Sequence, residues 1–229
     1  SQLSPYFHSG QISTHEVFDK ISELESWSPE SINPKMVGRR EGWWGSSENF
    51  ESFMDELITW RELGYHTCVR RANYNQYSSL PEWAIKTLNE HSSDEREHIY
   101  SLDQLTYSQT HDEIWNAAQN QLRTQGVIQN YLRMLWGKKI LEWTPNPQIA
   151  LSYMITLNDR YSLDGRDPNS YSGVFWILGR YDRAWGPERS IFGKIRYMTS
   201  DSTARKFNLK PYLEKWGNES LGLSTSILK

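Results

Sequence analysis

Apolar residues recur at spacings of three and four along almost the whole chain, and this spacing limits the fold more than any other feature. Val17, Ile21 and Leu24 follow the helical pattern, whereas sustained alternation of apolar and polar residues, typical of half-buried strands, is hard to find. The sequence therefore predicts an all-α fold. We expect helices at about residues 14–27, 47–69, 80–92, 101–125, 127–143, 147–162, 168–180 and 202–216.

Local signals agree with several of these helix ends. The pairs Asn146-Pro147 and Asp167-Pro168 each place a capping side chain before a proline at the first helical position. Gly126, Gly179 and Gly217 stand where helices should end. Because no repeat, low-complexity tract or flexible linker interrupts the pattern, we expect one compact bundle over residues 1–229.

Composition excludes several classes of protein. A chain of 229 residues can bury a core without staples, and its only cysteine, Cys68, excludes an intrachain disulfide. Mean hydropathy is −0.74, no apolar run approaches the length of a membrane span, and no secretory leader opens the chain. The six histidines and one cysteine show no metal-ligand spacing. We expect a soluble monomer without metal in the cytoplasm, near the nucleoid in a prokaryote, with the nucleus as the other possibility.

Charge is distributed unevenly along the sequence. Residues 1–115 hold 19 acidic and 9 basic residues, whereas residues 116–229 hold 9 acidic and 16 basic residues. Such polarity is typical of a protein that offers one face to phosphates, although two solvated faces of opposite sign explain it equally well.

Two stretches combine aromatic and charged residues. Trp136 and Trp143 are seven residues apart, so they lie on one side of a helix about 10 Å apart along its axis. A stripe of this kind is usually core, but Arg133 on the same flank needs a carboxylate or an anion as partner if it is buried. Charged residues of both signs also crowd into residues 158–167, just before an aromatic run at 171–176. A solvated loop would explain them, as would a pocket for a cofactor with polar edges and an apolar ring.

Four motifs in order resemble the photolyase and cryptochrome family. Residues 3–13, LSPYFHSGQIS, resemble a segment found across that family. Residues 136–143 (WGKKILEW), 163–169 (LDGRDPN) and 192–198 (FGKIRYM) resemble its class II branch. The resemblance runs from residue 3 to about residue 207.

The resemblance implies a fold, a cofactor and an activity. The expected fold is the helical FAD-binding catalytic domain, without the α/β antenna domain that usually precedes it. The expected activity is that of deoxyribodipyrimidine photolyase, a carbon–carbon lyase. It repairs cyclobutane pyrimidine dimers in damaged DNA by electron transfer from excited, reduced FAD to a flipped-out lesion.

The resemblance also assigns roles to individual residues. Expected cofactor contacts are Ser1, Gln2, Leu3, Ser4, Asn130, Arg133, Asn158, Asp164, Gly165 and Arg166. Of these, Arg133, Asn158 and Asp164 take catalytic roles beside the flavin, together with Glu56 at the lesion. Expected lesion contacts are Glu56, Trp60, Met134 and Trp176, and the expected electron-transfer chain is Trp136, Trp115 and Trp143. Duplex contacts are expected from Arg183, Trp185 and Arg196, and less strongly from Arg180, Lys194 and Arg205.

Two departures from the family pattern bear on these expectations. The tyrosine that usually precedes the first motif is missing, and Gln129 stands where the family more often has His. A cryptochrome-like light sensor that signals to a protein partner is the alternative function. A cofactor-free DNA-binding remnant is a third. Glu56, Trp60, Met134 and Trp176 favour repair, because together they form the family's lesion pocket.

Overall fold

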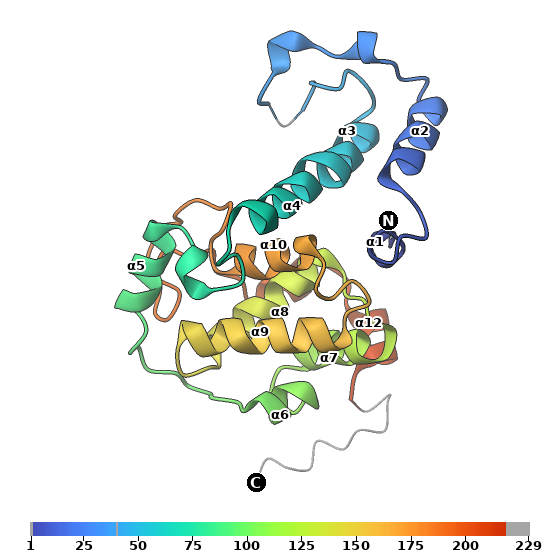
Figure 1. Ribbon diagram of the computed structural model, residues 1–229. Coiled ribbons are helices and arrows are strands. Elements are labelled where there is room, and N and C mark those ends of the chain that lie inside the picture. Colours follow the sequence, from blue (N-terminus) through green and yellow to red (C-terminus); the bar gives the residue numbers. More distant parts are fainter. Residues whose placement is uncertain (1, 40, 219–229) are drawn as a thin grey trace. The chain divides into compact units, whose positions relative to one another are not determined.

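A computed structural model describes residues 2–39 and 41–218 of the chain (Figure 1). In these residues helices and turns account for the regular structure, and the pairing between strands is limited to one isolated bridge from Arg189 to Gly193. The predicted all-α class is confirmed. None of the described helices is long and apolar enough to cross a membrane.

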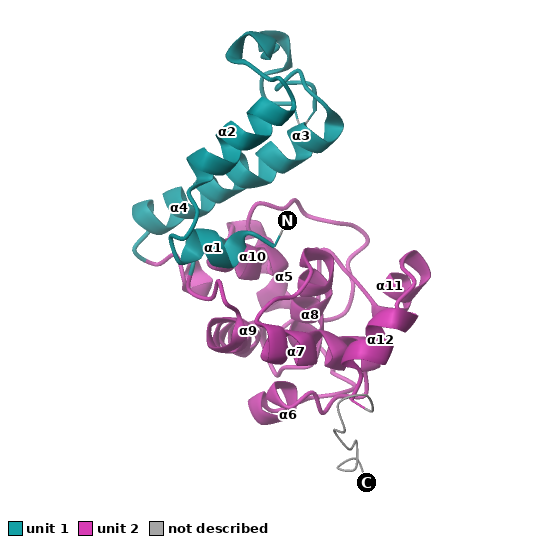
Figure 2. Ribbon diagram, turned by 90° about the vertical axis from the view of Figure 1, so that its right-hand side faces the viewer, with its two compact units in different colours: residues 1–72, 167–169 teal, residues 73–166, 170–229 magenta. Residues whose placement is uncertain are grey.

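The chain divides into two compact units, shown in separate colours in Figure 2. Unit 1 comprises residues 1–72 and 167–169, and unit 2 comprises residues 73–166 and 170–229. The sequence predicts one bundle because no linker marks the division near residue 72. Each unit has its own hydrophobic cluster.

Unit 1 is built from short helices. They are α1 (Ser4–His8), α2 (Thr14–Leu24), the 3-10 turns η1 (Pro29–Ser31) and η2 (Pro34–Met36), α3 (Glu48–Met54), the π-helical turn η3 (Asp55–Trp60) and α4 (Arg61–Arg70). Ser13 and Ser47 cap α2 and α3 by accepting the backbone N–H groups of Glu16 and Phe50. Helices α3, η3 and α4 follow one another without a break, as the predicted helix at 47–69 requires.

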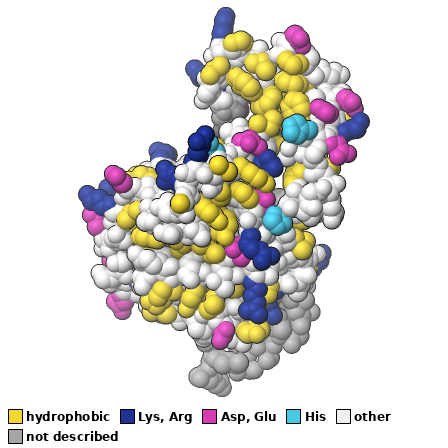
Figure 3. All heavy atoms as spheres, viewed as in Figure 1, with side chains coloured by type: hydrophobic (Ala, Val, Ile, Leu, Met, Phe, Trp, Pro, Cys, Tyr) yellow, Lys and Arg dark blue, Asp and Glu magenta, His cyan; other side chains and the backbone are white. Residues whose placement is uncertain are grey.

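The core of unit 1 is small. Val17, Phe50, Met54 and Leu57 are its buried members, and a shell of partly buried side chains surrounds them. Trp27 stacks on Phe50 with ring centroids 5.7 Å apart, and Trp44 meets Trp27 edge to face at 5.5 Å. Figure 3 shows apolar side chains gathered on the visible face of this unit. Aromatic contacts therefore stand in for a large aliphatic core here.

Unit 2 contains the longer helices. They are η4 (Tyr77–Ser79), α5 (Glu82–Glu90), α6 (Leu102–Thr106), α7 (Glu113–Gln125), α8 (Asn130–Glu142), α9 (Pro147–Tyr161), α10 (Pro168–Ile177), α11 (Ser200–Lys206) and α12 (Lys210–Trp216). The first two residues of α10 belong to unit 1, where the Asp167 carboxylate lies 3.3 Å from His8 Nδ1 and accepts from the Tyr65 hydroxyl at 3.4 Å.

Helix α8 occupies the centre of unit 2, against α7 and α9 (Figure 1). Residues 135–141 of α8 are all buried, so both helical faces are covered along this stretch. At Gly137 a Cβ atom would lie 2.2 Å from Ile177 Cδ1, at the end of α10. The glycine therefore allows α8 and α10 to approach more closely than any larger residue would permit.

Several predicted helix ends are confirmed and two predicted helices are divided. Asn146 caps α9 by accepting from Ile149 N at 2.9 Å, and Gly126 ends α7 with φ of 71°. The predicted helix at 101–125 is instead α6 and α7, because Asp112 starts a new helix by accepting from Trp115 N. The predicted helix at 202–216 is likewise α11 and α12. The short α1 was not predicted.

Candidate functional site

Arg133 on α8 is the centre of a polar cluster in unit 2. Its guanidinium Nη1 donates to Asn158 Oδ1 on α9 at 2.6 Å, and its Nη2 lies 3.9 Å from Asp164 Oδ1. Asn158 is 2% exposed, so this hydrogen bond lies inside the fold. Burial lowers the pKa of Arg133, and the charge of Asp164 opposes that shift. The sequence-predicted residues Arg133, Asn158 and Asp164 are thus brought together.

The loop after α9 fixes the position of Asp164. The Asp164 carboxylate accepts the hydroxyl of Ser162, and its backbone carbonyl accepts from Ser170 Oγ at 2.7 Å. At Gly165 a Cβ would lie 2.9 Å from the Ser162 carbonyl and 3.0 Å from that of Asn158. The loop therefore folds tightly back on the end of α9, and only glycine fits at this position without displacing backbone.

Asp159 organises the same loop, although the sequence alone gave it no role. Its carboxylate accepts from Arg166 N at 3.1 Å, from Tyr171 OH at 3.2 Å and from Asn158 Nδ2 at 3.4 Å. It thereby holds Arg166, whose φ is 69°, and orients the amide of Asn158. Its place in the charged stretch was visible in the sequence, but its partners depend on how the loop folds.

Asn130 and Met134 lie on the first turns of α8. Asn130 is the first residue of the helix and is exposed, and Met134 is half-buried one turn later. Gln129 is the residue before the helix, and its side chain makes no capping hydrogen bond.

The three predicted electron-transfer tryptophans form one buried group. Trp115, Trp136 and Trp143 are each 2% exposed or less. Trp115 meets Trp143 edge to face with ring centroids 5.6 Å apart, and its indole N–H donates to the Trp136 carbonyl at 3.0 Å. The indole N–H of Trp136 donates to Gln119 Oε1 at 2.8 Å. We call these three residues the tryptophan array.

Unit 1 carries the remaining candidates from the first part of the chain. Glu56 and Trp60 lie on η3, where Glu56 is exposed and Trp60 is half-buried. The indole of Trp60 donates to Asp55 Oδ2 at 2.8 Å, which fixes the ring and which the sequence did not predict. Gln2, Leu3 and Ser4 lie at the start of α1, whose N-terminus has no side-chain cap. Ser1 lies outside the described residues.

Trp176 lies on α10 and is half-buried, with its ring 6.2 Å from that of Tyr181. It belongs to unit 2, whereas Trp60 and Glu56 belong to unit 1. The predicted lesion contacts are therefore divided between the two units.

The predicted duplex contacts Arg183, Trp185 and Arg196 form a cation–π group. The guanidinium carbons of Arg183 and Arg196 lie 4.3 and 4.4 Å from the ring centroid of Trp185, and the Trp185 indole donates to Asp182 Oδ1 at 3.0 Å. Both guanidinium groups are thus held on one indole.

The three weaker duplex candidates have other surroundings. Arg180 is 5% exposed and donates to the Tyr74 carbonyl at 2.8 Å and to Ser79 Oγ, so a role in the fold accounts for it. Lys194 pairs with Glu188 at 3.3 Å, and Arg205 is exposed on the last turn of α11.

One pocket in unit 2 lies beside the Lys194–Glu188 ion pair, and neither the polar cluster around Arg133 nor the tryptophan array lines it. It encloses about 400 Å³ between α5 and the segment 184–194, and it is lined by Trp83, Lys86, Thr87, Glu90, Ala184, Glu188 and Lys194. Among the described residues no group of three or more His, Cys, Asp or Glu side chains could hold a metal ion.

Comparison with known proteins gives a consistent set of relatives. No protein-family model matches the chain. A deoxyribodipyrimidine photo-lyase of Methanothermobacter thermautotrophicus is 43% identical over 215 residues, which is 94% of this chain and 43% of that protein. Proteins of the same name from Arabidopsis thaliana and Potorous tridactylus are 42% and 41% identical over 93% and 94% of this chain, and over 39% and 37% of their own lengths.

The chain thus spans about two fifths of the length of these relatives. The matches cover the polar cluster around Arg133, the tryptophan array and nearly all of the helices described above. Over this length, the chain belongs to the deoxyribodipyrimidine photo-lyase family.

Proposed function

We propose that this chain binds a flavin, specifically FAD, and repairs cyclobutane pyrimidine dimers in DNA under light as a class II photolyase. The observation that carries the proposal is that α8 joins two kinds of site. Arg133 lies in the polar cluster near the start of the helix, and Trp136, the member of the tryptophan array on α8, follows one turn later. A cofactor held at Arg133 would therefore lie beside a row of oxidisable side chains.

The chemistry of the donor set fits a flavin. A flavin ring has a polar edge with hydrogen-bond donors and acceptors, and its reduced form is anionic. Arg133 offers N–H donors and positive charge, Asn158 a neutral amide, and Asp164 a carboxylate. Within the described residues, the 3.9 Å separation between Arg133 and Asp164 leaves both groups able to bind a third partner.

When bound, a reduced flavin supplies the light-driven electron that opens the cyclobutane ring. The residues of the chain prepare the site for that step. Arg133 stabilises negative charge on the ring, and Asp164 balances Arg133 when that charge is absent. Asn158 offers a hydrogen bond near the ring without adding negative charge, because its side chain is neutral and is held by Arg133 and Asp159.

Residues of both units would contact the DNA. Trp60 and Trp176 stack on the bases of the flipped-out dimer, Met134 packs against it, and Glu56 accepts a hydrogen bond from it. Arg183 and Arg196, which both lie over the Trp185 ring, contact phosphates. The exposure of Glu56 and the partial burial of the two tryptophans are compatible with these contacts.

The direct test is repair of an oligonucleotide containing one thymine dimer by the flavin-loaded chain under blue light. We expect the dimer to be lost in the light and retained in the dark. Trp136→Phe should block photoreduction of the oxidised flavin while leaving repair by chemically reduced protein intact. Cofactor released by denaturation identifies FAD by its mass.

Three results would contradict separate parts of the proposal. A loaded and reduced chain that leaves the dimer intact under light would favour a light sensor. A chain that binds no flavin would favour a DNA-binding remnant. Unchanged photoreduction in Trp136→Phe would remove the tryptophan array from the mechanism.

A further inference from the structure

We propose that Tyr100 is the last electron donor of the tryptophan array and that His111 takes its phenolic proton. The pair would form a proton-coupled exit at the end of the array remote from Arg133. The inference rests on the proposed function, because it requires the array to pass electrons toward a flavin.

Tyr100 is attached directly to the last tryptophan of the array. Its backbone N–H donates to the Trp143 carbonyl at 3.0 Å, and its ring meets that of Trp143 edge to face with centroids 5.4 Å apart. Tyr100 is 5% exposed and Trp143 is 2% exposed. Both rings are therefore held in contact by the fold, and water is largely excluded between them.

The hydroxyl of Tyr100 has a base as its neighbour. Its oxygen lies 2.7 Å from His111 Nδ1 and also accepts the backbone N–H of His111 at 3.1 Å. Burial and the neighbouring His98 lower the pKa of His111, which favours the neutral ring. A neutral imidazole with its proton on Nε2 accepts at Nδ1, so the phenol donates to it.

Among the described contacts, the indole N–H groups of Trp115 and Trp136 meet no such base. The indole N–H of Trp115 donates to a backbone carbonyl and that of Trp136 to the Gln119 amide, and neither acceptor takes up a proton at ordinary pH. A positive charge on these two rings is therefore not relieved by loss of a proton. Electrons would pass along the array in the order Trp143, Trp115, Trp136, and the Tyr100–His111 pair offers a base beside Trp143, where that path begins.

The step can be written with all atoms and electrons balanced. The Trp143 radical cation, formed when the array has given one electron to the light-excited, oxidised flavin, takes one electron from Tyr100. The O–H bond of Tyr100 breaks, and its proton forms an N–H bond at His111 Nδ1. Trp143 returns to its neutral state, Tyr100 becomes a neutral radical, and His111 becomes an imidazolium that can exchange its proton with water.

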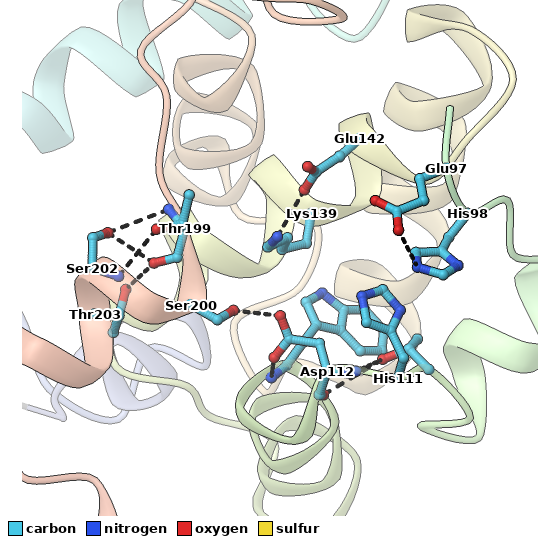
Figure 4. A network of polar contacts seen from close by, with 12 residues as sticks. Glu97, His98, His111, Asp112, Lys139, Glu142, Thr199, Ser200, Ser202 and Thr203 are labelled. Carbon is cyan, nitrogen blue, oxygen red and sulfur yellow. Dashed lines mark hydrogen bonds and ion pairs between the residues drawn. The ribbon is translucent and has the colours of Figure 1, made fainter. Parts of the chain in front are cut away.

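The surrounding charges favour this direction. The Lys139 ammonium lies 5.4 Å from the ring centroid of Trp143, where it disfavours a second positive charge. The His111 ring is buried only in part and the residue as a whole is exposed, so water can solvate the charge that it receives. The groups that face His111 are His98, with rings 4.0 Å apart, together with Asp112, Lys139 and Glu97 (Figure 4). Asp112 and Glu97 favour the imidazolium, whereas His98 and Lys139 oppose it.

Transient absorption of the flavin-loaded chain after a light flash tests the step. We expect the Trp143 radical cation to decay as a neutral tyrosyl radical appears, more slowly in heavy water and more slowly as the pH falls below the pKa of His111. Tyr100→Phe should abolish the tyrosyl signal and prolong the tryptophan radical. His111→Gln keeps a hydrogen-bond acceptor but removes the base, and it should slow tyrosyl formation by about 100-fold, the lower end of what a positioned base contributes.

Tyr107→Phe is the matched control. Tyr107 is 53% exposed, lies in the same part of unit 2 and meets a guanidinium, that of Arg123, in place of an imidazole. This variant should keep the wild-type kinetics. Tyrosyl formation that is unchanged in Tyr100→Phe, or equally fast in His111→Gln, would overturn the inference even if the array reduces the flavin.

A flavin-free readout separates this inference from the proposed function. If no Trp143 radical forms in the loaded chain, the proposed electron path fails, and the pair is then tested by oxidising the flavin-free chain with a flash-generated ruthenium(III) polypyridyl complex. Electron paramagnetic resonance should show a tyrosyl signal that Tyr100→Phe removes and that His111→Gln diminishes. A signal equal in all three proteins would reject the Tyr100–His111 pair.

Discussion

Lys138 is the most unusual titratable residue of unit 2, because its side chain is fully buried on α8 and donates to the Ile177 carbonyl at the end of α10. Burial lowers its pKa from 10.5 to about 7, and the attraction of Asp182 only partly opposes that shift. Between these two pH values the unfolded chain binds more protons at this residue than the folded chain does.

The stability of the fold should therefore rise with pH from 7 to 9, by up to about 1.4 kcal/mol per pH unit from this residue. Urea unfolding at pH 7, 8 and 9 measures the slope, and Lys138→Met should remove most of it. An equal slope in Lys138→Met would show that Lys138 has the same pKa in the folded and in the unfolded chain.

Trp176 distinguishes a lesion contact from ordinary core. If it stacks on a base of the dimer, Trp176→Ala should weaken binding of dimer-containing DNA by roughly 5- to 150-fold, the equivalent of about 1 to 3 kcal/mol. Binding of intact DNA, thermal stability and flavin content should change little. If the residue is core, the variant should instead lose about 3 to 5 kcal/mol of stability. Electrophoretic mobility shifts with both DNAs and a melting curve separate the outcomes.

Individual residues show where sequence reasoning succeeded and where it stopped. The need of Arg133 for a partner was evident from its place in an apolar stripe, and the structure supplies Asn158 and Asp164. Gln119 and Asp159 were not predicted, because their partners come from other segments. A residue whose role depends on tertiary contact leaves no periodic signal in the sequence.

At the scale of elements, the loop after α9 should be intolerant of even a methyl group. Gly165→Ala would place its Cβ against the backbone of Ser162 and Asn158, so we expect a loss of about 1 to 3 kcal/mol in stability and weaker flavin binding. Gly173→Ala on α10 is the matched control, because a Cβ there meets nothing within 4 Å. It should be neutral or stabilise the helix by up to about 1 kcal/mol.

Urea unfolding and flavin content of the two alanine variants provide the comparison. If Gly165→Ala were as stable as Gly173→Ala, the loop would have room to move, and its tight packing would not be what fixes Asp164.

Helix boundaries were predictable where a cap and an apolar pattern agree, as at Asn146 and Gly126. They were not predictable between α6 and α7, where the apolar spacing continues through the break. There Ser101 and Gln104 form a capping box for α6, and Asp112 caps α7. Side-chain hydrogen bonds to the backbone outweigh periodicity at this point.

For the molecule as a whole, the uneven charge should appear in DNA binding. Arg183→Ala and Arg196→Ala should each weaken binding to damaged and intact duplexes alike, and each should reduce the slope of log affinity against log salt by about 1. Arg160→Ala is the control, since Arg160 lies at the end of α9 over Tyr161 and outside the Trp185 group. Fluorescence anisotropy at several salt concentrations gives the slopes. A loss confined to damaged DNA would place Arg183 and Arg196 at the lesion instead.

The division into units also shows a limit of sequence reasoning at this scale. Helical periodicity is the same on both sides of residue 72, and residues 167–169 return to unit 1 from a distant part of the chain. The periodic pattern indicates which residues are buried, but it does not indicate which residues they contact. One uninterrupted pattern therefore gives no sign that the chain forms two separate cores.

The packing of helix α8 limits where the chain can tolerate insertions and deletions. Each residue advances a helix by about 100° and 1.5 Å. Deleting one residue between Arg133 and Trp136 would turn every later side chain of α8 by that angle relative to Arg133. The Trp136 bond to Gln119, the Lys138 bond to Ile177 and the contact at Gly137 would then all be lost together. Insertions and deletions should therefore be tolerated only in segments outside residues 130–142.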